Sequence, residues 1–171
     1  MSTKQGKIGL HRFNGDPTRF EAVADYIGLH FKGRVRYIAD VAGGQGMLCR
    51  YLNKKYNFDC TVIDPREHVL TGVKSRQSEY TKAMADYYDL IIGLHPDEAL
   101  KEVVESALVR PIIVIPCCNF WSKEEKLGRD ALLAKIEEYF AKNNVAFERV
   151  TFDFDGPKNI GLVTTPAQTT L

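Results

Sequence analysis

Residues 37–46 read Tyr-Ile-Ala-Asp-Val-Ala-Gly-Gly-Gln-Gly, an apolar run that passes into three glycines within four positions. Glycines directly after a strand let the backbone turn tightly and approach a ligand closely, because no Cβ stands in the way. A helix that begins after such a turn points its unpaired N–H groups at the same ligand. We therefore expect residues 37–42 to form a strand whose carboxyl end binds a ligand.

A carboxylate follows the next apolar run, at Asp64, twenty residues beyond Gly44. In an open parallel sheet, ligands lie outside the carboxyl ends of the strands, where the strand order reverses. A carboxylate in that place accepts hydrogen bonds from both hydroxyls of a ribose. The glycine loop and Asp64 together predict a nucleoside-binding site. A glycine-rich turn with no ligand remains the alternative.

Four short apolar runs, rich in β-branched side chains, predict strands at residues 37–42, 60–63, 89–92 and 112–115. Continuous runs of this kind are typical of strands buried on both faces of a parallel sheet. Apolar residues at helical spacing predict helices between them, at residues 47–56, 96–108 and 123–143. This alternation predicts an α/β protein with a Rossmann-like, doubly wound and mainly parallel sheet.

The end of the chain has a different pattern. Residues 145–154 alternate between apolar and polar side chains, and residues 160–165 follow after an Asp-Gly-Pro turn sequence. Two alternating segments joined by such a turn predict a closing hairpin with an antiparallel component.

We expect one domain over residues 16–171, preceded by a flexible segment at residues 1–15. Asp16 followed by Pro17 is typical of a helix start, with Asp as the N-cap residue and Pro at the first helical position. Between residues 64 and 88 there is room for one helix but hardly for two helices and a strand. The third strand of the sheet should therefore be shortened or missing.

The composition is that of an ordinary globular protein of 171 residues, 44% hydrophobic and 26% charged. The 23 basic residues against 22 acidic ones neither support nor exclude nucleic-acid binding. No apolar run has the length of a signal peptide or a membrane span, so a cytosolic protein that does not bind membranes is expected. The four cysteines, at positions 49, 60, 117 and 118, form no C-x-x-C pair. A structural zinc site is therefore not expected, and free thiols are the simpler interpretation.

Two cofactor patterns compete for the glycine loop. The dinucleotide pattern G-x-G-x-x-G, begun at Gly44, needs Gly or Ala at position 49, where the chain has Cys49; begun at Gly43 it fails at Gln45. The methyltransferase pattern, an acid followed by glycines at alternate positions, fits with one departure, because Ala42 stands where the first glycine is expected. A nicotinamide cofactor is therefore disfavoured.

Residues 40–46 with Asp64, residues 88–93 and the C-terminal hairpin together resemble a class I S-adenosylmethionine-dependent methyltransferase, over roughly residues 35–165. Two further segments, Gly-Leu-His-Pro-Asp-Glu-Ala at 93–99 and Val-Ile-Pro-Cys-Cys-Asn-Phe at 114–120, resemble a small subgroup with a Pro-Cys-Cys segment after its fourth main strand. More weakly, the chain is similar to the tRNA-serine uridine 2′-O-methyltransferases. The resemblance implies S-adenosylmethionine as the cofactor, held by Asp40, Ala42, Gly43, Gly44, Gly46 and Asp64.

The loops after the third and fourth main strands are the candidates for the acceptor side. His95 is the candidate catalytic base, because its ordinary pKa of about 6.5 lies close to working pH. The residues expected to line the substrate pocket are Asp97, Glu98, Pro116, Cys117 and Asn119. A plainer interpretation stays open for both loops, because Asp and Glu favour the first turn of any helix and cysteine is a common packing residue.

The sequence thus predicts a methyltransferase that acts by direct in-line transfer, without a metal, on an acceptor that it does not name. Small molecules, RNA and protein all remain open as acceptors. A catalytically silent relative that keeps the fold as a binding or scaffold module is the alternative. Ala42 and the shortened stretch after Asp64 motivate that alternative.

Overall fold

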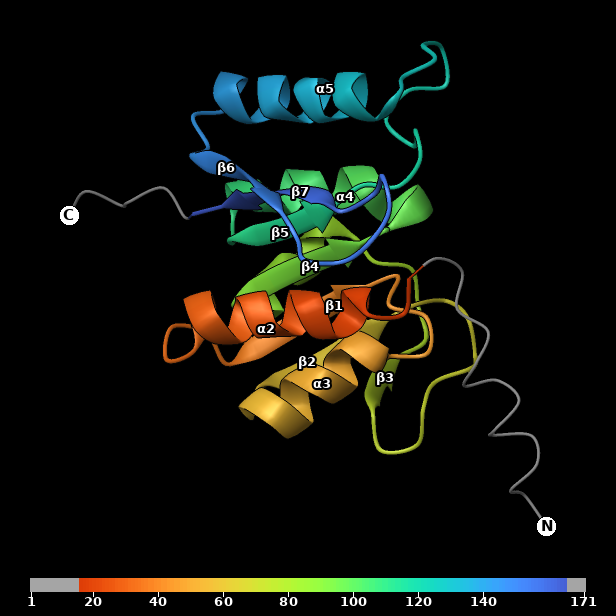
Figure 1. Ribbon diagram of the computed structural model, residues 1–171, viewed down its shortest axis with the longest axis vertical. Helices are drawn as coiled ribbons and strands as arrows, with labels where there is room; N and C mark the ends of the chain where they lie inside the picture. The colour runs from red at the N-terminus through yellow and green to blue at the C-terminus, as the bar shows by residue number, and fades with distance from the viewer. Residues whose placement is uncertain (1–15, 166–171) are drawn as a thin grey trace.

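The computed structural model describes residues 16–165, and the flexible segment expected at residues 1–15 lies outside them. Figure 1 shows one sheet with helices packed on both of its faces. The strands are β1 (Tyr37–Val41), β2 (Asp59–Ile63), β3 (Lys74–Arg76), β4 (Leu90–Leu94), β5 (Ile112–Ile115), β6 (Phe147–Thr151) and β7 (Ile160–Thr164). The α-helices are α2 (Arg19–Phe31), α3 (Met47–Tyr56), α4 (Leu100–Glu105) and α5 (Arg129–Lys142), and the 3-10 helices are η1 (Lys82–Tyr87), η2 (Asp97–Ala99) and η3 (Ser106–Leu108).

The sheet has the order β3-β2-β1-β4-β5-β7-β6. Neighbouring strands from β3 to β5 pair in parallel, whereas β7 pairs antiparallel with both β5 and β6. The order reverses between β1 and β4, which is where an open parallel sheet binds its ligands. The predicted doubly wound sheet with a closing antiparallel hairpin is confirmed.

Side chains on the two faces of the central strands enter two separate cores. Ile38 and Ile92 face α2 and α3, where they pack with Ile27 and Leu52. Their sequence neighbours face α4 and α5, in a core that includes Ala39, Val41, Ile91, Val103 and Phe140. Every residue of β4 and β5 is buried, which explains why these strands are continuous apolar runs in the sequence.

The third strand is present but short. β3 has three residues, all exposed, and among the described strands it pairs with β2 alone. The one helix of this region is η1, six residues long, and no α-helix forms between Ile63 and Leu90. The expected shortening of the third strand is therefore confirmed. The single helix for which this stretch has room is a 3-10 helix and not an α-helix.

Two predicted helix boundaries are wrong. The first helix begins at Arg19 and not at Pro17, because Asp16 closes a turn before it: its Oδ1 accepts from the Thr18 N–H at 2.9 Å, and its Oδ2 from the Thr18 hydroxyl at 2.7 Å. The last helix begins at Arg129 and not near residue 123. Ser122 Oγ accepts from the N–H groups of residues 124 and 125, but the Glu125 carbonyl accepts from the Asn119 side chain instead of a helical N–H group.

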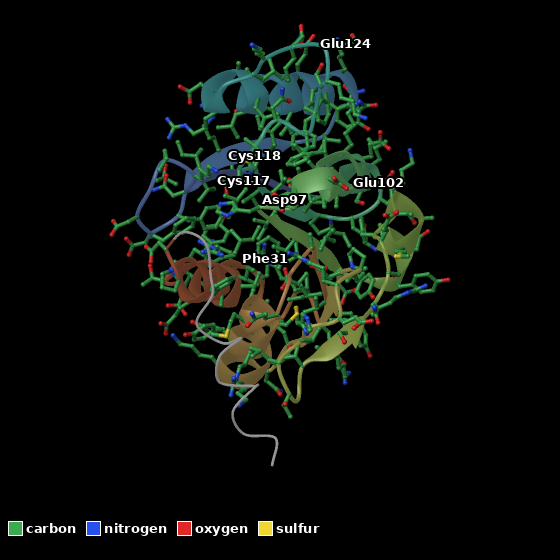
Figure 2. The ribbon with its side chains drawn as sticks, turned by 90° about the vertical axis from the view of Figure 1, so that its right-hand side faces the viewer. Phe31, Asp97, Glu102, Cys117, Cys118 and Glu124 are labelled. Atoms are coloured by element: carbon green, nitrogen blue, oxygen red, sulfur yellow. A yellow bond between two sulfur atoms is a disulfide. The ribbon has the colours of Figure 1, made fainter. Side chains whose placement is uncertain are left out.

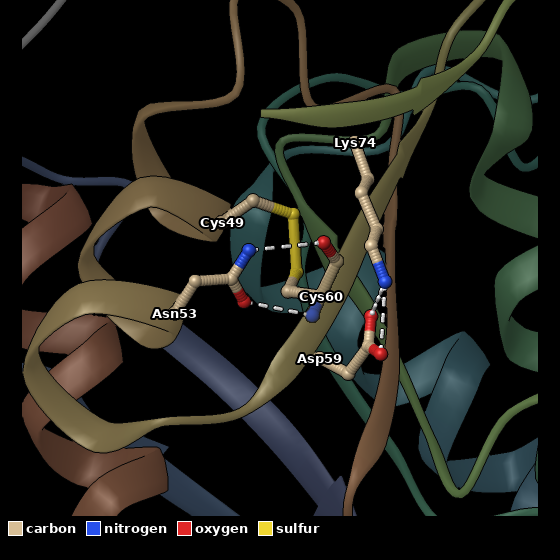
Figure 3. Close-up of a disulfide and its surroundings, with 5 residues drawn as sticks. All are labelled: Cys49, Asn53, Asp59, Cys60 and Lys74. Carbon is tan, nitrogen blue, oxygen red and sulfur yellow. Dashed lines mark hydrogen bonds and ion pairs between the residues drawn. A yellow bond between two sulfur atoms is a disulfide. The ribbon is translucent and has the colours of Figure 1, made fainter. Parts of the chain in front are cut away.

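The expectation of free thiols is wrong for two of the four cysteines. Cys49 on α3 and Cys60 on β2 form a disulfide, with 5.1 Å between their Cα atoms (Figure 3). The Asn53 side chain joins the same two elements, because its Oδ1 accepts from the Cys60 N–H at 2.8 Å and its Nδ2 donates to the Cys60 carbonyl at 3.2 Å. For a closed loop of about a dozen residues, the cross-link stabilises the fold by about 3 kcal/mol through lost unfolded-state entropy. The helix that follows the glycine loop is therefore fixed to the sheet.

Within residues 16–165, no helix combines the length and apolar character needed to cross a membrane.

Candidate functional site

The glycine loop lies at the switch point between β1 and β4. Ala42 takes a left-handed conformation, with φ of 53°, and so do Gly44 at 58° and Gly46, the N-cap residue of α3, at 86°. Alanine thus adopts a conformation that costs it of order 1–2 kcal/mol and glycine almost nothing. Gly43 is required for a different reason, because a Cβ on it would lie 2.3 Å from Oδ2 of Asp40. The loop backbone packs directly on that carboxylate.

Asp40 is a buried carboxylate that lacks a complete set of partners. Its side chain is only 2% exposed, and its Oδ2 has no hydrogen-bond partner among the residues the structure describes. Burial, together with the negative charge of Asp64, raises the pKa of Asp40 to about 7. It lines a cavity of about 440 Å³ together with the glycine loop and His95. A buried acceptor without a donor is costly, so this oxygen indicates a ligand with a donor or a positive charge.

Asp64 lies at the end of β2 and reaches the same loop. Its Oδ2 accepts from the Gly44 N–H at 2.8 Å, as expected for a carboxylate that faces the glycine turn. The other donors all belong to Arg66: the backbone N–H at 2.9 Å, Nε at 2.9 Å and Nη2 at 2.7 Å. Burial would raise the pKa of Asp64, but the bonds from Arg66 and Gly44 hold it below its ordinary value.

The bonds to Arg66 affect the predicted ribose contact. A carboxylate has about four acceptor sites, and Asp64 uses all of them on Gly44 and Arg66. The Arg66 side chain is 63% exposed, so solvent lies beside the ion pair. A ribose contact at Asp64 requires that the guanidinium be displaced.

His95 follows β4 and faces the cavity that Asp40 lines. Its Nε2 lies 3.0 Å from the backbone carbonyl of Lys158, in the loop between β6 and β7. Because a carbonyl only accepts, Nε2 carries the hydrogen in this arrangement and Nδ1 keeps a lone pair. Burial lowers the pKa of His95 below its ordinary value, which favours the neutral ring. A neutral imidazole with an available nitrogen is suited to accept a proton.

The loops after β4 and β5 meet at the carboxyl edge of the sheet, as expected for neighbouring parallel strands. Figure 2 shows Asp97 and Cys117 close together there. The Cys117 thiol donates to Oδ1 of Asp97 at 3.2 Å. Burial and this carboxylate raise the pKa of Cys117 to about 12. The thiol is therefore protonated and serves as a donor in the cavity wall, not as a nucleophile.

Of the other three residues predicted to line the substrate pocket, one lines a cavity beside the glycine loop and two do not. Glu98 is exposed and lines a second cavity, of about 710 Å³, beside the first. Pro116 is buried and lines neither cavity. Asn119 also lines neither cavity. Its Nδ2 donates to the Glu125 carbonyl at 2.7 Å, and its Oδ1 accepts from the N–H groups of Trp121 and Ser122. Asn119 therefore shapes the loop before α5.

The two cavities adjoin and form one cleft along the carboxyl edge of the sheet. They share four lining residues, Ala42, Arg66, Asp97 and Cys118. The larger cavity extends from Asp64 past Pro65 and Tyr80, and the smaller from Asp40 to His95. In the described part of the chain, no group of three His, Cys, Asp or Glu side chains is placed to hold a metal ion.

Three cationic residues of this cleft were missed in the sequence: Arg19, Arg66 and Lys158. Arg66 stands two residues after Asp64, so its pairing with that carboxylate was open to inference. Arg19 and Lys158 come from the first helix and the last hairpin, and no local pattern marks either of them. Only the fold brings them to the glycine loop.

No protein-family model and no curated protein matches the sequence. Solved structures do match. The sugar N-methyltransferase KedS8 from Streptoalloteichus is 15% identical with a TM-score of 0.56, over 87% of this chain and 88% of that one. The chain has the Rossmann-like methyltransferase fold.

Two further structures with the methyltransferase fold come from Burkholderia thailandensis. A 1,6-didemethyltoxoflavin-N1-methyltransferase with bound 1,6-didemethyltoxoflavin and S-adenosylhomocysteine is 15% identical, with a TM-score of 0.54, over 94% of this chain and 82% of that one. An O-methyltransferase family protein is 12% identical, with a TM-score of 0.52, over 86% of this chain and 56% of that one. The present chain thus spans little more than half of that protein.

Proposed function

We propose that this chain is a methyltransferase that binds S-adenosylmethionine along the carboxyl edge of its sheet. The observation that carries the proposal is Oδ2 of Asp40, which is buried beneath the glycine loop at the switch point and has no hydrogen-bond partner within residues 16–165. S-adenosylmethionine brings an ammonium group and a sulfonium, and either cation favours the ionised form of such a carboxylate. The residues present therefore fit the cofactor.

The two cavities divide the cofactor between them. Asp64 would hold the ribose hydroxyls, with Pro65 and Tyr80 of the larger cavity beside the base. Asp40 and the glycine loop would hold the amino-acid part in the smaller cavity. When bound, the cofactor supplies an electrophilic methyl group. Support for this assignment comes from the S-adenosylhomocysteine bound to the Burkholderia 1,6-didemethyltoxoflavin-N1-methyltransferase.

His95 would serve as the general base for an acceptor hydroxyl or amine. Its Nε2–H bond to the Lys158 carbonyl fixes the ring and leaves Nδ1 to take the proton. Burial lowers the pKa of the ring and so favours an unprotonated Nδ1 before the reaction. Alignment of the acceptor within the cleft would supply the remaining rate enhancement, because direct methyl transfer needs neither a metal nor a covalent nucleophile.

A catalytically silent module is the second candidate, and two observations favour it. Arg66 already fills the acceptor sites of Asp64, and Ala42 holds a strained left-handed conformation where a glycine is expected. A chain of this kind would keep the fold and the cleft without turnover. The Pro-Cys-Cys segment and the resemblance to tRNA-modifying enzymes leave RNA among the acceptors to be tested.

Two measurements separate these candidates. Isothermal titration with S-adenosylhomocysteine tests cofactor binding, and radiolabelled S-adenosylmethionine then tests methyl transfer to separated RNA, protein and small-molecule fractions. Binding together with transfer supports the enzyme. Binding without transfer to any fraction favours the silent module, and no heat at millimolar ligand contradicts the cofactor assignment altogether.

The affinity for S-adenosylhomocysteine should rise with pH. The pKa of Asp40 is about 7, so this carboxylate is mostly protonated at pH 6 and mostly ionised at pH 8, and only the ionised form attracts the ligand's ammonium group. We expect affinity to increase by up to about tenfold over that interval. Isothermal titration at several pH values measures this, and Asp40→Asn should bind weakly at every pH. A wild-type affinity that does not change with pH would show that Asp40 does not face the ligand.

Rising pH, which should strengthen ligand binding through Asp40, should lower the stability of the unliganded protein through the same carboxyl group. Its pKa in the folded chain lies above that of an unfolded aspartate, so the folded state holds the proton more tightly. The contribution of Asp40 to the free energy of unfolding is therefore present below about pH 4 and is lost as the pH rises through about 7.

A further inference from the structure

The two cavities of the cleft differ in charge. The larger one is lined by four acidic residues besides Asp97, namely Asp64, Glu79, Glu98 and Glu102, with Arg66 as its cation. The smaller one is lined by Arg19, Arg66 and Lys158, with Asp40 and Asp97 as its carboxylates. The end of the cleft nearest His95 is therefore the cationic end.

Most charged side chains that line the smaller cavity already have a partner or an assigned ligand. Arg66 is bound to Asp64, and Asp97 accepts the Cys117 thiol. Asp40 is assigned above to the cofactor. Arg19 is held as well, because its Nη1 donates to the Asp16 carbonyl at 3.0 Å and its guanidinium lies 4.3 Å from the centre of the Phe20 ring. Arg19 and Lys158 both line the cavity that His95 lines, so two cations share that cavity with the proposed base.

Lys158 lies beside His95 in the smaller cavity. Its backbone carbonyl accepts the His95 ring, while its Nζ lies 3.8 Å from the Cys118 sulfur. The side chain therefore extends from the β6–β7 loop, next to His95, toward the loop after β5. The preceding residue is held too, because Nη1 of Arg129 donates to the Pro157 carbonyl at 2.8 Å. No carboxylate of residues 16–165 forms an ion pair with Lys158 within 4 Å.

We propose that the methyl acceptor carries an anionic group, a phosphate or a carboxylate, which the Lys158 ammonium binds next to His95 with the Arg19 guanidinium beside it. This inference rests on the proposed function, because it names the class of acceptor for the same cleft. An anion at Lys158 also has a chemical consequence. Negative charge beside the ring favours the imidazolium, so the acceptor itself would make His95 a stronger base.

The test uses inorganic phosphate and, separately, acetate as probes, at constant ionic strength. Each is titrated into isotopically labelled protein with and without saturating S-adenosylhomocysteine, and binding is followed by NMR shifts of Lys158 and of the His95 ring. We expect saturable binding and a rise in the pKa of His95. Preference for phosphate or for acetate identifies the source of the anionic group.

Three variants give the test its controls. Lys158→Ala should weaken phosphate binding by about three- to tenfold, and Lys158→Arg should keep it within about twofold. Lys142→Ala removes an exposed lysine at the end of α5, far from the cleft lining, and should change nothing. Equal phosphate binding in wild type and Lys158→Ala, or no saturable binding, would overturn the proposal.

The cofactor measurement separates the two proposals. If Lys158→Ala loses S-adenosylhomocysteine as well, the lysine binds the carboxylate of the cofactor and the inference about the acceptor is wrong. If wild type binds phosphate through Lys158 but does not bind S-adenosylhomocysteine, the anion site stands and the proposed function fails.

Discussion

Replacing His95 with alanine should slow methyl transfer by about a hundredfold or more, the usual range for a general base, while the affinity for S-adenosylhomocysteine changes by less than about threefold. The ring acts on the acceptor proton and not on the nucleoside, so the loss should appear in the rate. The measurement is transfer of labelled methyl to the fraction that accepts it, alongside isothermal titration of each variant.

Alanine alone is an ambiguous substitution at this position. His95 has φ of 54°, a left-handed conformation that alanine adopts at a cost, and its ring also binds the Lys158 carbonyl. Asparagine tolerates this conformation better than alanine and has no basic nitrogen. His95→Asn should therefore fold like wild type and remain slow. A His95→Asn variant with wild-type rate would remove His95 from the chemistry.

Asp64→Ala should weaken S-adenosylhomocysteine binding by about ten- to a hundredfold or more, because each charge-assisted hydrogen bond to a ribose hydroxyl is worth about 1.5–3 kcal/mol. The substitution also leaves the Gly44 N–H and the Arg66 guanidinium without their acceptor. Thermal unfolding must therefore accompany the titration. An Asp64→Ala variant that folds and binds with unchanged affinity would contradict the ribose assignment.

Arg66→Ala is the matched control for Asp64. If ribose hydroxyls replace the guanidinium, this variant exposes the carboxylate in advance and should bind at least as tightly as wild type. If the ligand needs the ion pair intact, Arg66→Ala should weaken binding as much as Asp64→Ala does. The pair of variants thus tests how the site opens as well as which residue binds.

Elements set by local signals were predicted closely from the sequence. The helix Met47–Tyr56 has its predicted bounds, because a glycine turn precedes it and an asparagine in left-handed conformation, Asn57, ends it. The buried strands were recognisable because helices on both sides of the sheet favour apolar residues at most strand positions. The hairpin was recognisable from its alternation and its turn.

Features that depend on distant contacts were not predicted. Asp16 was taken as a helix cap, yet its Oδ2 also accepts the Asp155 N–H, from the other end of the chain. The disulfide needs α3 to fold back along β2, which brings Cys49 and Cys60 together despite the lack of a familiar spacing. Lys158 has no sequence signal at all, because only the insertion of β7 beside β5 carries its loop to His95.

The short strand β3 and the last hairpin also bear on how the protein behaves at high concentration. They form the two edges of the sheet, where unpaired backbone groups are a template for another chain. One edge is only three residues long and carries Lys74 and Arg76. The other, β6, carries Arg149, whose Nε bonds Glu137 at 2.8 Å, and Glu148, which accepts the Tyr26 hydroxyl. Both borders are thus charged, and adding a further strand from a neighbouring molecule would require desolvation of those charges, which protects the chain against aggregation through its strands.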